Sequence, residues 1–539
     1  MVLVLLIAGG ISAYVFLIRP LAHLGEQTAK LMSPDTEIYF TINLRPGADQ
    51  LLKFRNTLLK FEEESDFEEN RDDWIDMLKD ETGIDFKDDV LPWLGPEIAV
   101  GVIDVFDDAK PLVVIGTTDN DATEGMLEDL IDYLEDSLDQ KFERDSYHDF
   151  PIYSNEDRYT WEADQHYALI NGYILFSTDL EVIEDAISLT ESLGASLADD
   201  EDFKTAQKSV PSKRVSFLFA DIDSMYRHYM ETASSGQEEE ILAYLRDRTP
   251  ETVAMSTSFI DNGFRIDFYA DNPLGSTFEP GRNEVKSAEI FPSDTLAMIS
   301  LNNPRSFWDS TMDALGQNED LLGEFEEALE EFQYEFGLDV ERDIFSWMTG
   351  ELAIALLPSD INLDRYGDVE GTVDVVAVFE TDDAEKVDEV LGVIHDILED
   401  EGFYFKRSSM REHDVTLLDG EPFGEFYSPG YTFLPDFLVI GSNKEVLTNI
   451  IDTYEGEGSS LREDKGYSQL QPNLEGEQII QMYFNLEEIR EMVLDLLDCS
   501  DRATYRREIA SFVEPLDSLA ITSTITDETS RLTIMIAVK

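Results

Sequence analysis

Two stretches of the chain resemble each other: DVLPWLGPEIAV at Asp89–Val100 and DIFSWMTGELAI at Asp343–Ile354. Trp93 aligns with Trp347, which gives an offset of 347 − 93 = 254 residues. The same offset aligns the preceding GIDFKDDV with GLDVERDI. An internal repeat of this length indicates a duplicated domain.

Further matches follow downstream. The segment that begins VVIGTTDNDATEG at Val113 parallels VVAVFETDDAEKV at Val375, and the strand-like segment at Val253 aligns with the one at Leu519. The offset drifts to about 266, as insertions in loops would cause. We therefore predict a transmembrane signal anchor at 1–19, a juxtamembrane segment at 20–30, one α+β copy at 31–270, a linker at 271–289 and a second copy at 290–539.

Each copy mixes strand and helix patterns. In EIAVGV, Ile98, Val100 and Val102 alternate with small or polar residues, which is typical of a half-buried strand. Residues 122–138 carry an apolar stripe at helical spacing, and Asn171-Gly172 favours a hairpin turn. The fold class predicted is α+β: a tandem duplication of a mainly antiparallel sheet with helices packed on one face, preceded by one N-terminal transmembrane helix.

The repeated stretch contains a tryptophan and a glutamate in both copies. Trp93 and Trp347 precede a strand, so we expect each indole to close the end of a sheet against the helices and to donate to one acceptor. Glu97 and Glu351 recur at strand starts. A side chain that faces solvent or bonds to backbone is the favoured interpretation, and a ligand-binding role is the alternative.

The N-terminus holds an uncharged apolar run, Val2–Ile18. Seventeen helical residues would span about 26 Å, close to the hydrocarbon core of a bilayer. We predict an uncleaved single-pass anchor whose partner is the lipid bilayer, in the cell membrane, with the bulk of the chain outside the cytoplasm. A cleaved signal peptide and a buried core helix are the alternatives.

Composition limits the partners. The 539 residues include 116 Asp plus Glu against 39 Lys plus Arg, a formal net charge of −77. Such a chain repels phosphate backbones, so no nucleic-acid partner is expected. The acidity fits a solvated surface suited to salt, a set of Ca²⁺ sites or a basic partner, and the first is favoured.

Chemical motifs are absent from the sequence. There is no GxSxG, GxxxxGK[ST], GxGxxG or HExxH pattern. Cys499 is the single cysteine, and six histidines (His23, His148, His166, His228, His395 and His413) lack the spacing of zinc ligands. We therefore name no catalytic, cofactor-binding or metal-binding residue.

One segment resembles a calcium loop. In DINLDRYGDVEG, Asp360, Asn362, Asp364 and Asp368 stand at positions 1, 3, 5 and 9. Position 6 is an arginine and position 12 a glycine, where such a loop needs glycine and glutamate. A polar hairpin loop is the favoured interpretation.

The order of these segments is that of a known family. SPDTEIYFTINLRP, then TGIDFKDDVLPWLGPEIAV, then hairpin and helix segments ending in FLFADI, resembles a bacterial membrane-anchored family called domain of unknown function 3352. The element PWLGPE, Pro92–Glu97, is its most specific part, and the second copy departs from it at Ser346, Thr349 and Gly350. The resemblance implies a membrane-attached extracytoplasmic protein and brings no activity, cofactor or catalytic residue.

The function expected is therefore non-enzymatic binding or scaffolding in the cell envelope, with an envelope protein as partner. Two duplicated domains offer two similar binding faces. The alternatives are a carboxylate-based or divalent-metal-assisted hydrolase with a site between the two copies, and a purely structural protein stabilised by salt.

Overall fold

The structure is a computed structural model that describes residues 27–539 apart from these gaps: 63–89, 107, 139–140, 156–163, 233–248, 272–284, 317–318, 349, 360–361, 364–368, 371–372, 420–427, 474–477, 498 and 527–528. The chain divides into two compact units, Met1–Asn272 and Pro273–Lys539. Each unit is an antiparallel sheet with helices, so the α+β class predicted from the sequence is confirmed.

Every strand of the first unit pairs antiparallel with its neighbours. Its hairpins include β6–β7, which turns at the predicted Asn171-Gly172. The order across the sheet is β4 (Glu143–Tyr147), β5 (Phe150–Asn155), β6 (Gln165–Ile170), β7 (Tyr173–Ser177), β3 (Lys110–Thr117), β2 (Leu94–Ile103), β1 (Ile38–Asn43), β8 (Ser216–Asp221), β9 (Thr252–Ile260) and β10 (Gly263–Asp271).

The second unit repeats this strand order, position by position. Its sheet runs β16 (Tyr404–Met410), β17 (His413–Asp419), β18 (Gly430–Leu434), β19 (Phe437–Gly441), β15 (Val373–Glu380), β12 (Glu351–Pro358), β11 (Ala297–Asn302), β20 (Ile480–Asn485), β21 (Leu516–Ile525) and β22 (Thr529–Val538). A chain that visits its strands in the same unusual order twice has the topology of a duplicated domain.

Helices and short turns fill the connections. In the first unit they are η1 (Thr28–Leu31), α2 (Ala48–Glu62), α4 (Asn120–Leu138), α5 (Leu180–Thr190), η3 (Leu197–Asp199), α6 (Glu201–Ser209) and α7 (Ile222–Thr232). In the second they are η4 (Lys286–Glu289), α9 (Pro304–Leu315), α10 (Glu319–Phe336), η5 (Val340–Ile344), η6 (Phe345–Trp347), α11 (Ala384–Asp400), α12 (Lys444–Tyr454), η8 (Leu461–Glu463), α13 (Lys465–Leu470), η9 (Gln471–Asn473), α14 (Leu486–Leu496), α15 (Cys499–Glu508) and α16 (Ala510–Val513).

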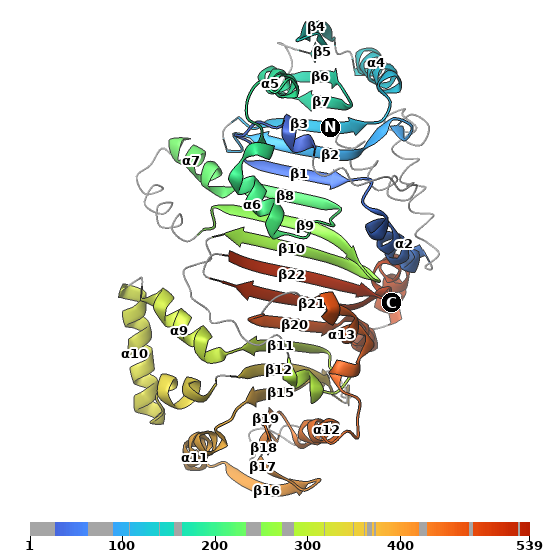
Figure 1. The fold of residues 1–539 in the computed structure, drawn as a ribbon. Helices are drawn as coiled ribbons and strands as arrows, with labels where there is room; N and C mark the ends of the chain where they lie inside the picture. Colours follow the sequence, from blue (N-terminus) through green and yellow to red (C-terminus); the bar gives the residue numbers. More distant parts are fainter. Residues whose placement is uncertain are drawn as a thin grey trace. The chain divides into compact units, whose positions relative to one another are not determined.

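Helices cover both faces of the first sheet, so the prediction of one covered face is wrong. Leu175 and Phe176 are adjacent on β7 and therefore point to opposite faces. Leu175 belongs to a core cluster with Val182 and Ile183 of α5. Phe176 packs on the opposite face, against the cluster that contains Leu127 of α4. Figure 1 shows α6 lying over β8 and β9, on the side of α5.

The shift in repeat offset has a structural cause. The loop between β2 and β3 is short, whereas β12 and β15 are separated by a small hairpin of β13 (Asn362–Leu363) and β14 (Val369–Glu370). This hairpin is the segment compared above with a calcium loop, and its pairing fits the favoured hairpin interpretation. Asp360, Asp364 and Asp368 lie outside the described residues.

The predicted anchor, Val2–Ile18, lies outside the described residues. Among the helices that are described, none is both long enough and apolar enough to cross a membrane. The anchor and the orientation derived from it therefore stay predictions.

Candidate functional site

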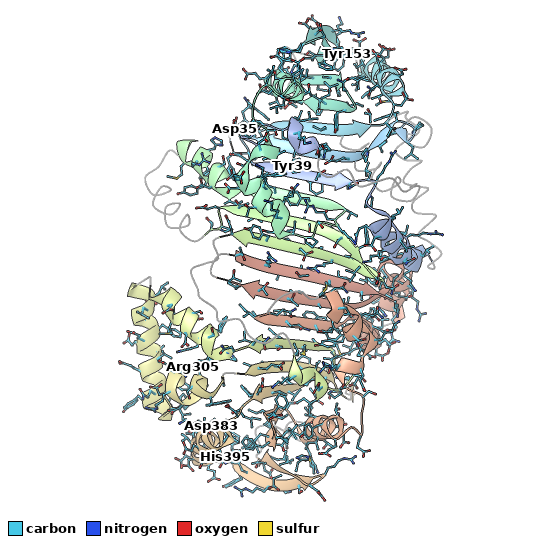
Figure 2. All side chains as sticks on the ribbon, in the orientation of Figure 1. Asp35, Tyr39, Tyr153, Arg305, Asp383 and His395 are labelled. Carbon is cyan, nitrogen blue, oxygen red and sulfur yellow. The ribbon has the colours of Figure 1, made fainter. Side chains whose placement is uncertain are left out.

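The recurring glutamate of the first unit is buried and fully engaged. Glu97 is 6% exposed on β2. Its Oε1 accepts hydrogen bonds from the hydroxyls of Thr28 (2.9 Å) and Thr41 (3.3 Å), and its Oε2 accepts one from the backbone N–H of Gln27 (3.0 Å). The hydroxyl of Thr28 also forms a hydrogen bond of 2.7 Å with the hydroxyl of Tyr39. Tyr39 lies on β1 (Figure 2). The carboxylate thus ties Gln27 and Thr28 to the sheet.

Glu351 repeats this arrangement in the second unit. It is 3% exposed. Its Oε1 accepts from the hydroxyls of Ser287 (2.5 Å) and Ser300 (2.8 Å), and its Oε2 accepts from the backbone N–H groups of Lys286 (2.8 Å) and Ser287 (3.0 Å). Burial raises the pKa of Glu351, although these hydrogen bonds favour its charged form.

We call each of these glutamates, Glu97 and Glu351, together with the donors just named, a clamp. Four donors satisfy the acceptor sites of the Glu351 carboxylate, which leaves it no capacity for a ligand. The backbone-bonded interpretation is confirmed. The clamps bind Gln27 and Thr28, which fall in the predicted juxtamembrane segment, and Lys286 and Ser287, which fall in the predicted linker.

The tryptophans of the repeat are structural, as predicted. Trp93 is 4% exposed in a cluster with Ile98, Val113 and Ile115. Trp347 is 7% exposed, packs against Val387 and Leu391 of α11, and donates its indole N–H to the backbone oxygen of Asp343 at 3.0 Å.

The glycine of PWLGPE has a steric role. A Cβ at Gly95 would lie 2.3 Å from the backbone carbon of Gly116, so no larger residue fits at this irregularity of β2. In the second unit Glu380 occupies the position of Gly116. Its Oε2 accepts from the N–H of Glu351 at 3.0 Å and its Oε1 pairs with Lys286. The motif therefore shapes the start of β2 near its clamp. In the second copy the side chain of Glu380 lies at the corresponding position.

The described histidines are scattered, as the sequence indicates. His166 is buried beside Ser154, His228 pairs with Glu37, and His395 stacks on Phe405. Within the described ranges, no group of three or more His, Cys, Asp or Glu side chains could hold a metal ion.

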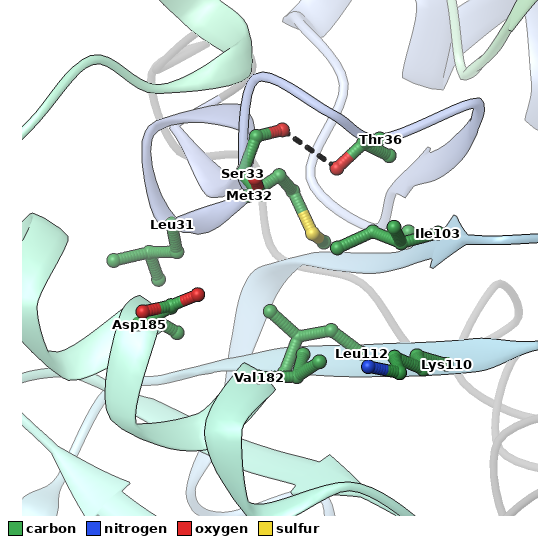
Figure 3. A pocket seen from close by; sticks show the side chains of 11 residues that line it. Leu31, Met32, Ser33, Thr36, Ile103, Lys110, Leu112, Val182 and Asp185 are labelled. Carbon is green, nitrogen blue, oxygen red and sulfur yellow. Dashed lines mark hydrogen bonds between the residues drawn. The ribbon is translucent and has the colours of Figure 1, made fainter. Parts of the chain in front are cut away.

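A small hollow lies where η1 meets the first sheet. Figure 3 shows Met32 and Leu31 on one side, with Asp185 and Val182 of α5 opposite. Its volume is about 10 Å³. That is room for one water molecule at most, so it is a packing defect and not a ligand site.

The second unit has an open apolar sheet face, which we define by Ile299, Ile354, Leu356 and Val375. They are 39%, 40%, 38% and 42% exposed. Ile299 pairs with Ile354 and Leu356 pairs with Val375 in neighbouring strands, so the four side chains share one face.

The helix that follows the first strand packs differently in the two units, as the first unit shows. There α2, which follows β1, packs on β9 and β10, and Phe54 lies 4.9 Å from Phe259, ring centroid to centroid. The corresponding helix, α9, packs instead on η6 and α10, with Trp308 stacked on Phe345 at 4.6 Å. The sequence carried one signal of this face, because ELAIALLP is apolar on both sides of the strand.

Comparison with known proteins identifies the family. The profile described as "Protein of unknown function (DUF3352)" matches residues 1–418. The chain belongs to this family. The match spans the first unit and the second as far as β17, and so includes both clamps. The resemblance inferred from PWLGPE is confirmed as to family, and the family's description assigns no activity.

Other comparisons add little. No curated protein matches the chain. A solved structure titled "Structure of crystal form I of TP0453" is similar at 7% identity and a TM-score of 0.23, and covers 46% of this chain and 78% of that one. A similarity this low carries no argument about function.

Proposed function

We propose that the protein is a non-enzymatic binding or scaffolding protein of the cell envelope, attached to the membrane by Val2–Ile18 with both units outside the cytoplasm. The open apolar face of the second unit is the observation that supports binding. Contiguous exposed apolar side chains are typical of interaction sites in an otherwise polar surface.

The recurring polar residues support the non-enzymatic part of this proposal. The buried carboxylates of the repeat are engaged in the clamps, and the repeated tryptophans pack in cores. The repeated glutamates and tryptophans thus stabilise the unit in which each lies. The hydrolase alternative stays a prediction that no contact among the described residues favours.

The partner we propose is a protein surface with an apolar centre and a rim of lysine and arginine. A chain of net charge −77 repels anionic lipid headgroups, which disfavours direct insertion of the face into a bilayer. A basic rim would instead be attracted over a distance of about 8 Å at physiological salt.

The test of binding uses a charge on the open face. Ile354→Asp in the tagged full-length chain is expected to abolish co-purification of the partner while the melting temperature changes little, because Ile354 is 40% exposed. Tyr334→Asp on α10, at a 92% exposed position, is the matched control and should retain the partner. Equal recovery from both variants would contradict the proposal.

Attachment needs its own test. The full-length chain should stay with membranes after carbonate washing, whereas a chain lacking residues 1–26 should not. External protease should cleave both units in intact spheroplasts. Protection of the units would place them inside the cytoplasm and overturn the proposed orientation.

A further inference from the structure

An acid-lined pocket opens in the second unit, away from the open apolar face. Its volume is about 320 Å³. It lies near the ends of β20 and β21, where α13 and α14 begin. Five carboxylates line it with two lysines: Asp294, Asp464, Glu487, Glu488 and Asp517, with Lys465 and Lys539.

Two of these carboxylates have structural tasks. Asp464 accepts at Oδ1 from the N–H of Tyr467 (2.8 Å), which caps α13, and from the hydroxyl of Tyr483 (3.0 Å). Glu487 accepts at Oε1 from the ammonium of Lys539 at 2.6 Å. Neither needs a ligand to be satisfied.

Asp517 is different. It is 9% exposed, and its buried Oδ2 has no hydrogen-bond partner among the described residues. Oδ2 lies close to the backbone of Gly466, where a Cβ would come within 2.9 Å of it. Burial raises the pKa of Asp517, and the charge of Glu487 adds to the effect. A buried carboxylate oxygen without a donor costs free energy unless something else satisfies it.

Two residues that line this pocket are replaced at the matching positions of the first unit. The strand pairs Asn485–Ser518 and Asp221–Thr252 correspond, so Glu251 occupies the position of Asp517 in the first unit. Glu251 is exposed. Phe219 occupies the position of Tyr483 in the first unit, so the first unit has no hydroxyl at this position.

We propose that this pocket binds an alkylammonium cation, whose ammonium group pairs with the carboxylate of Asp517. An ammonium carries three N–H donors and a positive charge, which complements an acidic pocket with one unsatisfied oxygen. A metal ion fits less well, because the described carboxylates here do not converge as ligands. The volume is also that of a site for a small organic molecule.

Two sources could supply this chemistry: a free polyamine and the lysine side chain of a partner. The inference goes beyond the proposed function and is independent of it, since the pocket and the open apolar face share no residue.

The test is calorimetric titration of the full-length chain with spermidine, with Nα-acetyl-lysine methylamide and with CaCl₂, all at one ionic strength. Asp517→Asn should weaken binding of the preferred amine at least tenfold. It should also leave the melting temperature unchanged or raise it, because it removes a buried charge that lacks a partner. Glu251→Gln, the same change of charge at the exposed matching position, should bind as wild type.

The outcomes separate the possibilities. Tighter binding of spermidine indicates a free polyamine, and tighter binding of the lysine derivative indicates a partner's side chain. Glu488 also lines the pocket, so amine binding to Glu488→Gln provides a second measurement if Asp517→Asn is poorly folded. Amine binding that neither variant weakens would reflect the general acidity of the chain and overturn the proposal, as would no amine binding or a preference for Ca²⁺.

Discussion

At the residue scale, the clamp carboxylates collect donors from distant parts of the sequence. Glu351 binds backbone and hydroxyl donors that lie 64 to 65 positions before it in the chain, and a further hydroxyl, that of Ser300, 51 positions before it. A short polar segment can dock on a sheet in this way because one ionised side chain satisfies several donors at once. The clamp therefore fixes Gln27 and Thr28 in the first unit, and Lys286 and Ser287 in the second, against the sheet.

Removing the carboxylate should release that segment. Glu351→Ala leaves two N–H groups and two hydroxyls without an acceptor, which should cost about 3 kcal/mol of the free energy of unfolding. Hydrogen exchange at Lys286 and Ser287 should accelerate, while exchange at Thr28–Leu31 in the first unit serves as the internal control. Unchanged exchange at Ser287 would show that the clamp does not hold this segment.

Asp343 gives a prediction about pH. The guanidinium of Arg342, at 2.6 Å, together with Lys386 at 3.2 Å, holds the pKa of Asp343 well below its ordinary value. The stabilisation is thus present above the unfolded pKa of about 3.9 and is lost as pH falls below it.

Asp343→Asn should therefore lower the free energy of unfolding by about 1–2 kcal/mol at pH 7 and by less in acid. Denaturant titrations between pH 7 and pH 3 measure this difference. Asp388→Asn, an exposed position on the same helix that carries Lys386, is the control and should change little. A loss that is equal at both pH values would rule out the ion pairs as its cause.

At the element scale, the irregular start of β2 depends on a glycine. Gly95→Ala would place a Cβ within 2.3 Å of the backbone of Gly116. Because Gly116 pairs with Tyr173 in the neighbouring strand, its backbone cannot move without disturbing that pair, so a loss above about 2 kcal/mol is expected. Gly125→Ala in α4 meets nothing within 4 Å and should stabilise the helix by about 1 kcal/mol. Thermal melts of both variants check the opposite signs, and two shifts of the same sign would refute this account of Gly95.

Most elements could be predicted because their signals are local. Alternation identified β2, the Asn171-Gly172 turn identified the β6–β7 hairpin, and Asp119 caps α4 by accepting from the N–H groups of Asp121 and Ala122. The covered faces were predicted wrongly although a signal existed. Four consecutive apolar residues in β3, Leu112–Ile115, are all buried, as a strand between two layers of helices requires.

The site residues were harder to predict because their partners are distant. Nothing near Glu97 in the sequence indicates that Thr28 and Thr41 will meet its carboxylate. Asp517 is one acid among 116 Asp plus Glu residues, and only its burial without a donor distinguishes it. Tertiary packing supplies that information, and periodicity does not.

At the scale of the whole molecule, duplication was followed by divergence. Both units keep the strand order, the tryptophan and the clamp. Among the described residues, the second unit combines a helix packed on η6 and α10, the hairpin of β13 and β14, and the pocket at Asp517. The binding features proposed above belong to the second unit.

Photo-crosslinking in living cells from position 354 of the full-length chain tests the central claim most directly. The account predicts one dominant adduct with an envelope protein, joined through an apolar peptide flanked by lysine or arginine, and no such adduct from the exposed control position Tyr334. Adducts with lipid or with a second copy of this chain, equal labelling from both positions, or no adduct would contradict the proposed role of the open apolar face.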